Sequence, residues 1–254
     1  MRFSTDLISR LRGATHVAVF TGAGVSAESG IPTFRDRQSG LWQNFDAQSL
    51  ATPEAFERDP AFVWGWYEWR RSRVLASHPN AAHRAIALLA ERVPRLTLIT
   101  QNVDDLHERA GSREVLHLHG RICSPYCSAC GLEYPAPQPA LLEPECGRRL
   151  EPPRCGQCGG RVRPGVVWFG ESLPRLAWEQ AVQAAQGCGA FLCVGTSSIV
   201  EPAASLTRVA IAAGSVTIQV NIDSTWLDDL VTLNLCGPAA SMLPELVAEI
   251  WPQA

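Results

Sequence analysis

Apolar residues along the chain fall into short unbroken runs that alternate with longer segments of helical spacing. The unbroken runs are residues 16–20, 96–100, 190–194 and 217–220. Runs of this length without polar alternation predict strands that are buried on both faces of a parallel sheet. Helical spacing is found at residues 4–13, 80–90, 176–185, 203–213 and 241–250. Alternating strands and helices predict an α/β fold with a doubly wound, Rossmann-like parallel sheet.

Small or polar residues directly follow three of the predicted strands. Gln101 and Asn102 follow the second run, Gly195-Thr196-Ser197 the third and Asn221 the fourth. In open α/β sheets, ligands bind outside the carboxyl ends of the strands. We therefore expect these side chains to line one crevice at that edge of the sheet.

Two segments interrupt the alternating pattern. Residues 36–78 are rich in aromatic side chains and arginine without β-like alternation, which predicts a helical insert, whereas residues 121–163 are rich in proline and cysteine and lack periodicity. Short regular segments are expected on either side of the second insert, at 115–119 and 166–171. We predict three domains: a Rossmann-like domain from residues 1–35, 79–120 and 164–254, a helical module over 36–78 and a zinc-binding module over 121–163.

The zinc prediction depends on how the nine cysteines are spaced. Four of them form two Cys-x-x-Cys pairs, Cys127 with Cys130 and Cys155 with Cys158. Such pairs present four thiolates to one tetrahedral ion, and Zn²⁺ is its default occupant in a reducing compartment. Four thiolates complete the coordination shell, so we expect a structural metal. Cys123 and Cys146 are possible substitutes for one ligand, and we expect Cys188, Cys193 and Cys236 to be buried small apolar residues.

Charge and composition narrow the classes of partner. The formal net charge is -3, and all 22 basic side chains are arginine. A weakly acidic chain has no general attraction to nucleic acid or anionic lipid, so we expect no specific nucleic-acid or membrane partner. No stretch approaches the roughly 20 apolar residues of a membrane span, and the first residues lack an apolar signal core. We expect a cytoplasmic protein, and its lack of lysine means that it is not itself modified on that side chain.

A glycine-containing turn follows the first predicted strand. Gly22 and Gly24 lie where backbone can approach a phosphate closely, although Gly30-Ile31-Pro32 interrupts the helix that would follow. A dehydrogenase fingerprint would have a third glycine three residues after the second and an acidic residue about 20 positions on. The turn therefore predicts a phosphate site that lacks the dehydrogenase fingerprint. A tight turn with no ligand is the alternative.

His119, at the end of a predicted strand, is the candidate base. A neutral imidazole at the sheet crevice can take a proton from a hydroxyl near physiological pH. His117 shares its strand face, so a His-x-His metal pair is an alternative, as are two framework histidines.

An ordered set of motifs resembles the sirtuin family, and the resemblance covers nearly the whole chain. The motifs are Gly-Ala-Gly-Val-Ser-Ala-Glu-Ser-Gly-Ile-Pro-Thr-Phe-Arg from Gly22, Thr-Gln-Asn-Val-Asp from Thr100, His119-Gly120, the paired cysteines, Phe169-Gly170-Glu171 and Gly195-Thr196-Ser197-Ser198. The resemblance implies NAD-dependent removal of acyl groups from protein lysines, in a bacterial type of sirtuin. It implies that His119 activates a ribose hydroxyl after nicotinamide leaves, with free lysine and O-acyl-ADP-ribose as the other products.

The resemblance also implies residue roles. Asn102 would join His119 as a catalytic residue. NAD would be bound by Gly22, Ala23, Gly24, Ser26, Phe34, Arg35, Gln101, Asn102, Asp104, Gly195, Thr196, Ser197, Asn221, Ile222, Asp223 and Ala239. The acylated peptide would be bound by Ala47, Tyr67, Arg70, Val167, Phe169, Gly170, Glu171 and Val200.

Tyr67 and Arg70 refine the expected substrate. They lie at i and i+3 of a predicted helix and resemble the Tyr-x-x-Arg pair of sirtuins that prefer succinyl, malonyl or glutaryl lysine. Arginine binds a carboxylate with two parallel hydrogen bonds, whereas an acetyl group offers no partner. Ala47 resembles the small residue that widens this pocket. Alternatively, Tyr67 and Arg70 are surface residues of an aromatic helix.

Three further expectations concern partners and competing functions. The resemblance implies that acylated lysine peptides pair as a strand between residues 169–171 and 199–202. Acidic-acyl relatives often carry an aromatic residue where this chain has Glu201, which leaves the preferred peptide sequence open. We expect a monomer. The competing functions are protein mono-ADP-ribosyl transfer from the same NAD site, and a non-catalytic zinc-ribbon adaptor.

Overall fold

The computed structural model describes residues 3–33, 47–136, 144 and 147–252. Its centre is a six-stranded sheet in the order β3-β2-β1-β6-β7-β8, and every neighbouring pair is parallel. The strands are β1 (Val17–Thr21), β2 (Leu96–Thr100), β3 (Leu116–His117), β6 (Ala190–Val194), β7 (Val216–Asn221) and β8 (Leu233–Cys236). The predicted doubly wound α/β fold is confirmed.

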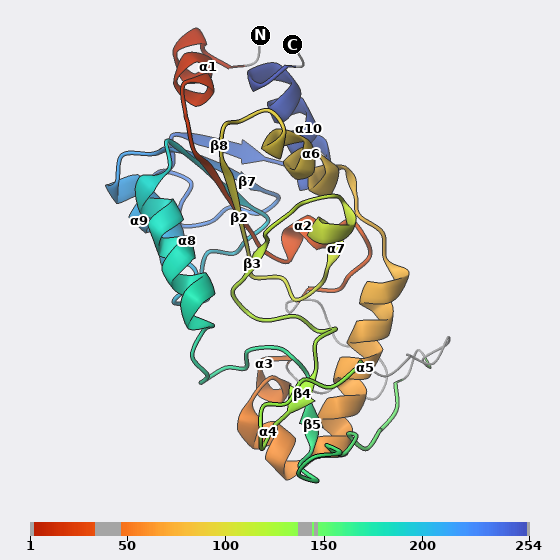
Figure 1. Cartoon of the computed structure of the whole chain (residues 1–254). Coiled ribbons are helices and arrows are strands. Elements are labelled where there is room, and N and C mark those ends of the chain that lie inside the picture. The colour runs from red at the N-terminus through yellow and green to blue at the C-terminus, as the bar shows by residue number, and fades with distance from the viewer. Residues whose placement is uncertain (1–2, 34–46, 137–143, 145–146, 253–254) are drawn as a thin grey trace.

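Helices cover both faces of this sheet (Figure 1). One face packs against α1 (Thr5–Arg12), α6 (Ala81–Ala90) and α10 (Ala239–Ile250), and the other against α8 (Arg175–Gly187) and α9 (Ser205–Ala212). Successive strand residues alternate between the two cores, as Val19 faces the first and Phe20 the second. The residues on both faces of the strands are buried, so the strands appear in the sequence as unbroken apolar runs.

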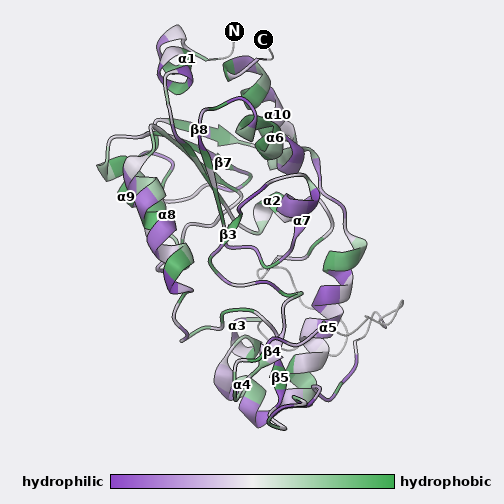
Figure 2. Ribbon diagram, in the orientation of Figure 1, coloured by the Kyte–Doolittle hydropathy of each residue, from purple (hydrophilic) through white to green (hydrophobic). Residues whose placement is uncertain are grey.

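A third core lies away from the sheet. It contains side chains from α3 (Ala47–Leu50), α4 (Pro53–Arg58) and α5 (Pro60–Ala76), packed against Ile122, Val162, Val166 and Trp168. The antiparallel pair β4 (Tyr126–Cys127) and β5 (Val162–Arg163) lies beside these helices at the end of the molecule opposite the two termini (Figure 1). We call α3–α5 with residues 121–136 and 147–168 the small region. Figure 2 shows that hydrophobic colour is continuous along the central strands and interrupted along α5.

One expected strand is shorter than predicted, one expected regular segment is irregular, and two short elements were not predicted. The strand expected at 115–119 is only two residues long, and residues 166–171 form neither helix nor strand. Conversely, β8 and the short helix α7 (Leu106–Arg109) were not predicted. β8 is an edge strand whose residues alternate between half-buried and exposed, so it lacks the apolar run that marks the other strands. Within the described residues, no helix is long and apolar enough to cross a lipid bilayer.

Candidate active site and metal centre

The carboxyl ends of β1, β2, β6 and β7 converge on Thr196. The Gln101 side-chain amide donates to Thr196 Oγ1 at 2.9 Å, and the Asn221 amide donates to the Thr196 carbonyl at 3.2 Å. Gln101 N donates to the Thr21 carbonyl at 3.0 Å, which joins the ends of β1 and β2. The structure thus brings together the polar residues that the sequence placed after three separate strands.

The glycines of the first turn lie against the turn after β6. A Cβ on Gly24 would approach Gly195 Cα to 2.8 Å, and one on Gly22 would approach Thr196 Cβ to 2.8 Å. The Gly24 N–H donates to the Gly195 carbonyl at 2.8 Å, and the Gly22 N–H donates to the Val194 carbonyl at 3.0 Å. These glycines are therefore required by the packing of two loops, a reason that the sequence did not reveal. Ala23 lies between them and is half-buried.

The helix after this turn, α2 (Gly24–Ala27), is one turn long and carries the buried residue Ser26. Its hydroxyl donates to Asp104 Oδ2 at 3.0 Å and accepts from the Asn102 side-chain amide at 3.1 Å. Burial raises the pKa of the Asp104 carboxyl. Ser26 therefore holds Asn102 and Asp104 in a fixed relation beneath the strand ends.

His83 supports Ser26 from α6, and sequence reasoning missed this residue. Asn80 N donates to His83 Nδ1 at 3.3 Å, so the ring proton is on Nε2, which lies 3.4 Å from Ser26 Oγ. The His83 ring also packs against His107, with centroids 4.9 Å apart. Burial lowers the pKa of His83 to about 4 and that of His107 to about 3. The Asn80-x-x-His83 spacing before an amphipathic helix resembles a capping box and was the available signal.

His119 has the protonation state of a base. Its Nδ1 lies 3.1 Å from the Gln101 carbonyl, which only accepts hydrogen bonds, so Nδ1 carries the proton and Nε2 keeps its lone pair. Burial lowers the pKa of the ring, and it is therefore neutral at pH 7.

His117 has a different role from His119. Its Nδ1 lies 3.1 Å from the Asn102 carbonyl, and its Nε2 lies 2.8 Å from Glu108 Oε1. Both ring nitrogens therefore face oxygen acceptors. Among the described residues, the only group of three or more side chains that could hold a metal is the cysteine cluster. The structure thus gives no support to the His-x-His metal alternative.

Tyr67 and Arg70 lie on one face of α5 and are buried, with exposed fractions of 3% and 9%. The alternative that they are surface residues was wrong. The Tyr67 hydroxyl accepts from Trp168 Nε1 at 3.0 Å, and the Arg70 guanidinium lies 5.0 Å from the Trp66 ring centroid. Burial raises the pKa of Tyr67 and lowers that of Arg70. Ala47, the small residue expected near this pair, is buried in the same core.

The segment 166–171 joins the base to the small region. Val167 N donates to the His119 carbonyl and Phe169 N to the Ala51 carbonyl, both at 2.9 Å. Phe169 is exposed, and Gly170 has a φ of +87°. Glu171 accepts from both terminal nitrogens of Arg163, at 2.5 and 2.8 Å, so its side chain stabilises the segment.

The remaining sequence candidates lie around these elements. Ser197 and Val200 are half-buried after β6, Ile222 and Asp223 are exposed after β7, and Ala239 begins α10 and is buried. Phe34, Arg35 and Cys146 lie outside the described residues. Cys236 is exposed, in contrast to the expectation, because it ends the edge strand β8, and Cys188 and Cys193 are buried as expected.

The four paired cysteines converge between β4 and β5. Their sulfurs all lie within 4.8 Å of one another, with Cys127 and Cys158 at 3.4 Å and Cys130 and Cys155 at 3.8 Å. A tetrahedral Zn²⁺ with Zn–S bonds of about 2.3 Å separates its ligands by about 3.8 Å. The cluster is therefore positioned to bind zinc, and four thiolates leave no open position for catalysis. Cys123 is half-buried and is not part of the cluster.

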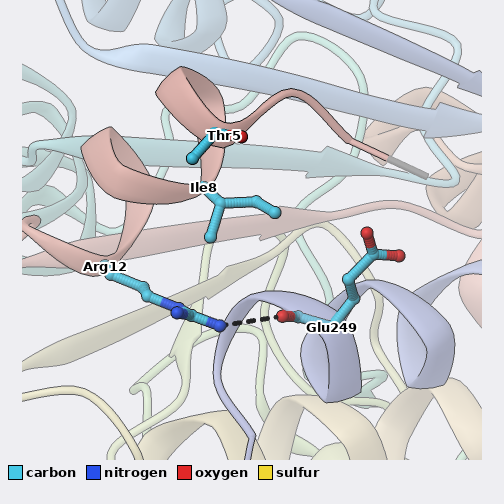
Figure 3. Close-up of a pocket in the computed structure, with 4 residues that line it drawn as sticks. All are labelled: Thr5, Ile8, Arg12 and Glu249. Carbon is cyan, nitrogen blue, oxygen red and sulfur yellow. Dashed lines mark hydrogen bonds between the residues drawn. The ribbon is translucent and has the colours of Figure 1, made fainter. Parts of the chain in front are cut away.

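A groove between α1 and α10 is separate from the strand ends (Figure 3). It is lined by Thr5, Ile8, Arg12 and Glu249. Arg12 donates to the carbonyls of Ile250 at 2.6 Å and Glu249 at 3.2 Å, so its guanidinium joins the two helices. None of the candidate residues lines this groove.

An open parallel sheet with polar strand ends and an adjoining four-cysteine ribbon defines a doubly wound α/β protein with a metal-binding insert. A family model described as the Sir2 family matches residues 22–202, and the chain belongs to this family, the sirtuins. It is 57% identical over 247 residues to the "NAD-dependent protein deacylase" of Methylococcus capsulatus, and the match covers 97% of each chain.

Solved structures agree with this assignment. A crystal structure of a Sir2 homolog–NAD complex superposes with a TM-score of 0.88 at 40% identity, covering 98% of this chain and 94% of the other. A complex described as Sir2–p53 peptide–NAD+ gives a TM-score of 0.83 at 29% identity, covering 96% and 97%. The resemblance inferred from the sequence motifs is confirmed.

Proposed function

We propose that this protein is an NAD-dependent protein-lysine deacylase. The observation that carries the proposal is the neutral His119, whose Nδ1 is bonded to the Gln101 carbonyl after β2 and whose Nε2 is unprotonated, in a chain that belongs to the Sir2 family. The relative from Methylococcus capsulatus is named as such a deacylase, and Sir2 neighbours form complexes with NAD and with a peptide.

The residues at the strand ends fit a dinucleotide that carries hydroxyl and amide groups. Ala23 would face the phosphates from the first turn, Gln101 and Asn102 the ribose, and Thr196 and Asn221 the adenosine side. The side-chain amides of Gln101, Asn102 and Asn221 donate at 2.9–3.2 Å to the Thr196 hydroxyl, the Ser26 hydroxyl and the Thr196 carbonyl, respectively. Amide and hydroxyl groups recognise sugar hydroxyls without charge. NAD, when bound, supplies an electrophilic ribose carbon and leaves as nicotinamide and an ADP-ribose product.

His119 acts on a ribose hydroxyl as a general base. Its Nδ1–H remains bonded to the Gln101 carbonyl while Nε2 takes the proton, so the ring keeps its orientation in both protonation states. Since its pKa is lowered, the base is already neutral at pH 7, and activity that depends on it would be lost only below the ordinary histidine range. Ser26 and His117 orient Asn102 beside it through its side chain and its carbonyl.

The pocket at Tyr67 and Arg70 would favour acyl groups that end in a carboxylate, such as succinyl and malonyl. A carboxylate at the end of the acyl chain would add a charge-assisted pair of hydrogen bonds to the buried Arg70 guanidinium, and an acetyl group has no charged oxygen to form them. Acetyl groups would still be removed, at lower efficiency, because the rest of the site acts on the amide carbonyl and not on the end of the acyl chain.

The substrate would be a lysine side chain in an extended peptide. Phe169 and Ile199 are exposed on the two segments that would flank the peptide, and pairing through main-chain groups tolerates many sequences. Glu201 forms an ion pair with Arg208 at 2.6 Å, so its charge is partly compensated before any peptide binds.

We also propose that the enzyme is a monomer in the cytoplasm.

The test measures nicotinamide released from NAD with acetyl-lysine and succinyl-lysine peptides. We expect release with both and a higher kcat/KM with succinyl-lysine; no release with either would contradict the deacylase proposal. Label from NAD retained on protein would favour ADP-ribosyl transfer instead.

Arg70→Met tests the acyl pocket separately. Loss of a charge-assisted pair of hydrogen bonds should lower kcat/KM for succinyl-lysine by about 30- to 100-fold and leave acetyl-lysine within about threefold. Arg73→Met on the same helix is the matched control, because Arg73 is exposed and lies over the Trp69 ring. Equal losses on both peptides would contradict the proposed specificity.

A further inference from the structure

Trp168 has a buried indole N–H directed at the hydroxyl of Tyr67. The distance from Trp168 Nε1 to Tyr67 Oη is 3.0 Å, and both residues are only 3% exposed. An indole N–H can only donate, so the Tyr67 oxygen is the acceptor in this bond.

This bond determines what the Tyr67 hydroxyl offers to a ligand. A phenol has one O–H donor, whose proton prefers one of two in-plane directions, and the Trp168 N–H repels it from the direction that Trp168 occupies. Burial raises the pKa of Tyr67, so the hydroxyl keeps this proton. The group therefore presents a donor on the side away from Trp168, which matches an acceptor-only carboxylate.

Trp168 is itself held by a set of charged contacts. The Arg163 guanidinium lies 3.5 Å from the centroid of the Trp168 ring, and both of its terminal nitrogens bind Glu171. Glu171 Oε2 also accepts from Trp168 N at 2.8 Å, and the Phe56 ring packs at a centroid distance of 5.3 Å. The indole is thus held through its backbone and its ring, with its N–H directed at the Tyr67 hydroxyl.

The neighbours of Trp168 connect this contact to the reaction centre. Val167 and Phe169 bind the carbonyls of His119 and Ala51 through their backbone N–H groups. One three-residue segment therefore contacts the strand end that carries the base and positions the hydroxyl on α5.

We propose that Trp168 is a specificity-positioning residue, which selects lysine acyl groups ending in a carboxylate by fixing the Tyr67 hydroxyl as a donor. The inference rests on the proposed acyl pocket and adds a residue that does not itself touch the acyl carboxylate. Its action requires the indole nitrogen and not only the ring.

The test compares Trp168→Phe, Tyr67→Phe and the double variant on succinyl-lysine and acetyl-lysine peptides. Trp168→Phe should lower the succinyl-to-acetyl ratio of kcat/KM about five- to tenfold, which corresponds to one hydrogen bond between neutral groups. In the Tyr67→Phe background the same change should leave the ratio unaltered. Trp64→Phe is the matched control, since Trp64 is buried in the same core and is expected to leave the ratio unchanged.

Three results would overturn the inference. Equal loss on both peptides would assign Trp168 to packing, and a fall in the ratio that persists with Tyr67→Phe would show that Trp168 does not act through Tyr67. A ratio that stays at the wild-type value in Trp168→Phe would show that the indole N–H is dispensable. The acyl pocket itself is tested separately with the wild-type protein, by measuring the binding of the two peptides by calorimetry without NAD. Equal affinities for the succinyl-lysine and acetyl-lysine peptides would contradict the proposed pocket and, with it, the proposed role of Trp168.

Discussion

The sheet and the small region are stabilised by different kinds of side chain. Both cores of the sheet consist mainly of aliphatic residues, such as Val19 and Leu192 in the first and Ile99 and Leu206 in the second. The core of the small region contains Phe56, Trp64, Trp66, Tyr67 and Trp168, with Arg70 and Arg163 buried beside them. The cores of the sheet repeat similar aliphatic contacts, whereas the core of the small region depends on contacts between particular aromatic and arginine side chains.

The difference follows from the backbone of each region. Strands β1, β6 and β7 pair with a neighbouring strand on both sides, which satisfies their polar backbone groups, so apolar burial is sufficient to stabilise them. In the small region, β4 and β5 pair over two residues each, and much of the backbone lies in turns. Such a segment needs a metal and charge-assisted contacts to define one conformation. The proposed acyl pocket lies on this side, and the proposed NAD crevice lies at the edge of the sheet.

Removal of the metal should give the largest separation between the two regions. Cys155→Ser, or a strong chelator, should eliminate activity and unfold residues around β4 and β5, since structural zinc contributes on the order of 10 kcal/mol to folding of such modules. Amide hydrogen exchange should show lost protection there and retained protection in β1, β6 and β7. Cys123→Ser is the control because Cys123 lies outside the cluster. Equal loss of protection in the sheet would contradict the independence of its core.

Acid should act on the sheet side through His83 and His107. Their pKa values in the folded protein, about 4 and about 3, lie below the ordinary value of 6.5, so the unfolded chain binds more protons in this window. The free energy of unfolding should therefore fall as the pH falls from about 6.5 to about 4. Urea titrations of the metal-loaded protein at a series of pH values measure this slope.

Variants assign the slope to the buried pair. His107→Gln should be less stable than the wild type at pH 7 because it replaces a buried ring, but its stability should depend less on pH below 6.5. His78→Gln, at an exposed position, should keep the wild-type slope. A slope unchanged by His107→Gln would show that the acid sensitivity originates elsewhere.

Gly24→Ala should give the smallest effect of the three, confined to the edge of the sheet. Its Cβ would lie 2.8 Å from Gly195 Cα and O, so the two loops must separate, at a cost of about 1–3 kcal/mol in stability. NAD affinity should fall as well. The control is Gly187→Ala, whose added Cβ would have no atom within 4 Å, and it should leave stability and NAD affinity unchanged within error. Thermal unfolding measures the stability of the two variants, and NAD titration measures their affinity. Unchanged stability in Gly24→Ala would mean that the loops adjust freely.

Prediction from the sequence succeeded where burial is periodic. The strands β1, β2, β6 and β7 and the helix α6 were located to within one or two residues, because unbroken apolar runs and an Asn80 cap mark them. Prediction failed for β8 and α7, which are short and partly exposed to solvent. β8 lies at the sheet edge, and α7 is a single turn whose Leu106 N is bound by the Asp104 side chain at 3.1 Å. Neither leaves a pattern long enough to recognise.

The candidate site shows the same division. The sequence named Ser26, Asn102 and His119 from their motifs, but not the contacts that set their protonation and orientation. His83 and Trp168 were not singled out for such contacts, since each contacts a residue that is distant in sequence: His83 contacts Ser26, and Trp168 contacts Tyr67 across 101 positions.

The sequence by itself determined the family, the central strands of the sheet and the four cysteines positioned to bind zinc, because motif order, apolar runs and cysteine spacing are local properties of the chain. Only the tertiary structure decided that Gly22 and Gly24 serve the contact between two loops, that Tyr67 and Arg70 are buried, and that the Tyr67 hydroxyl is held by Trp168. These properties depend on contacts between residues that are distant in sequence, because such contacts determine the direction of a hydrogen bond and the loss of solvent around a side chain.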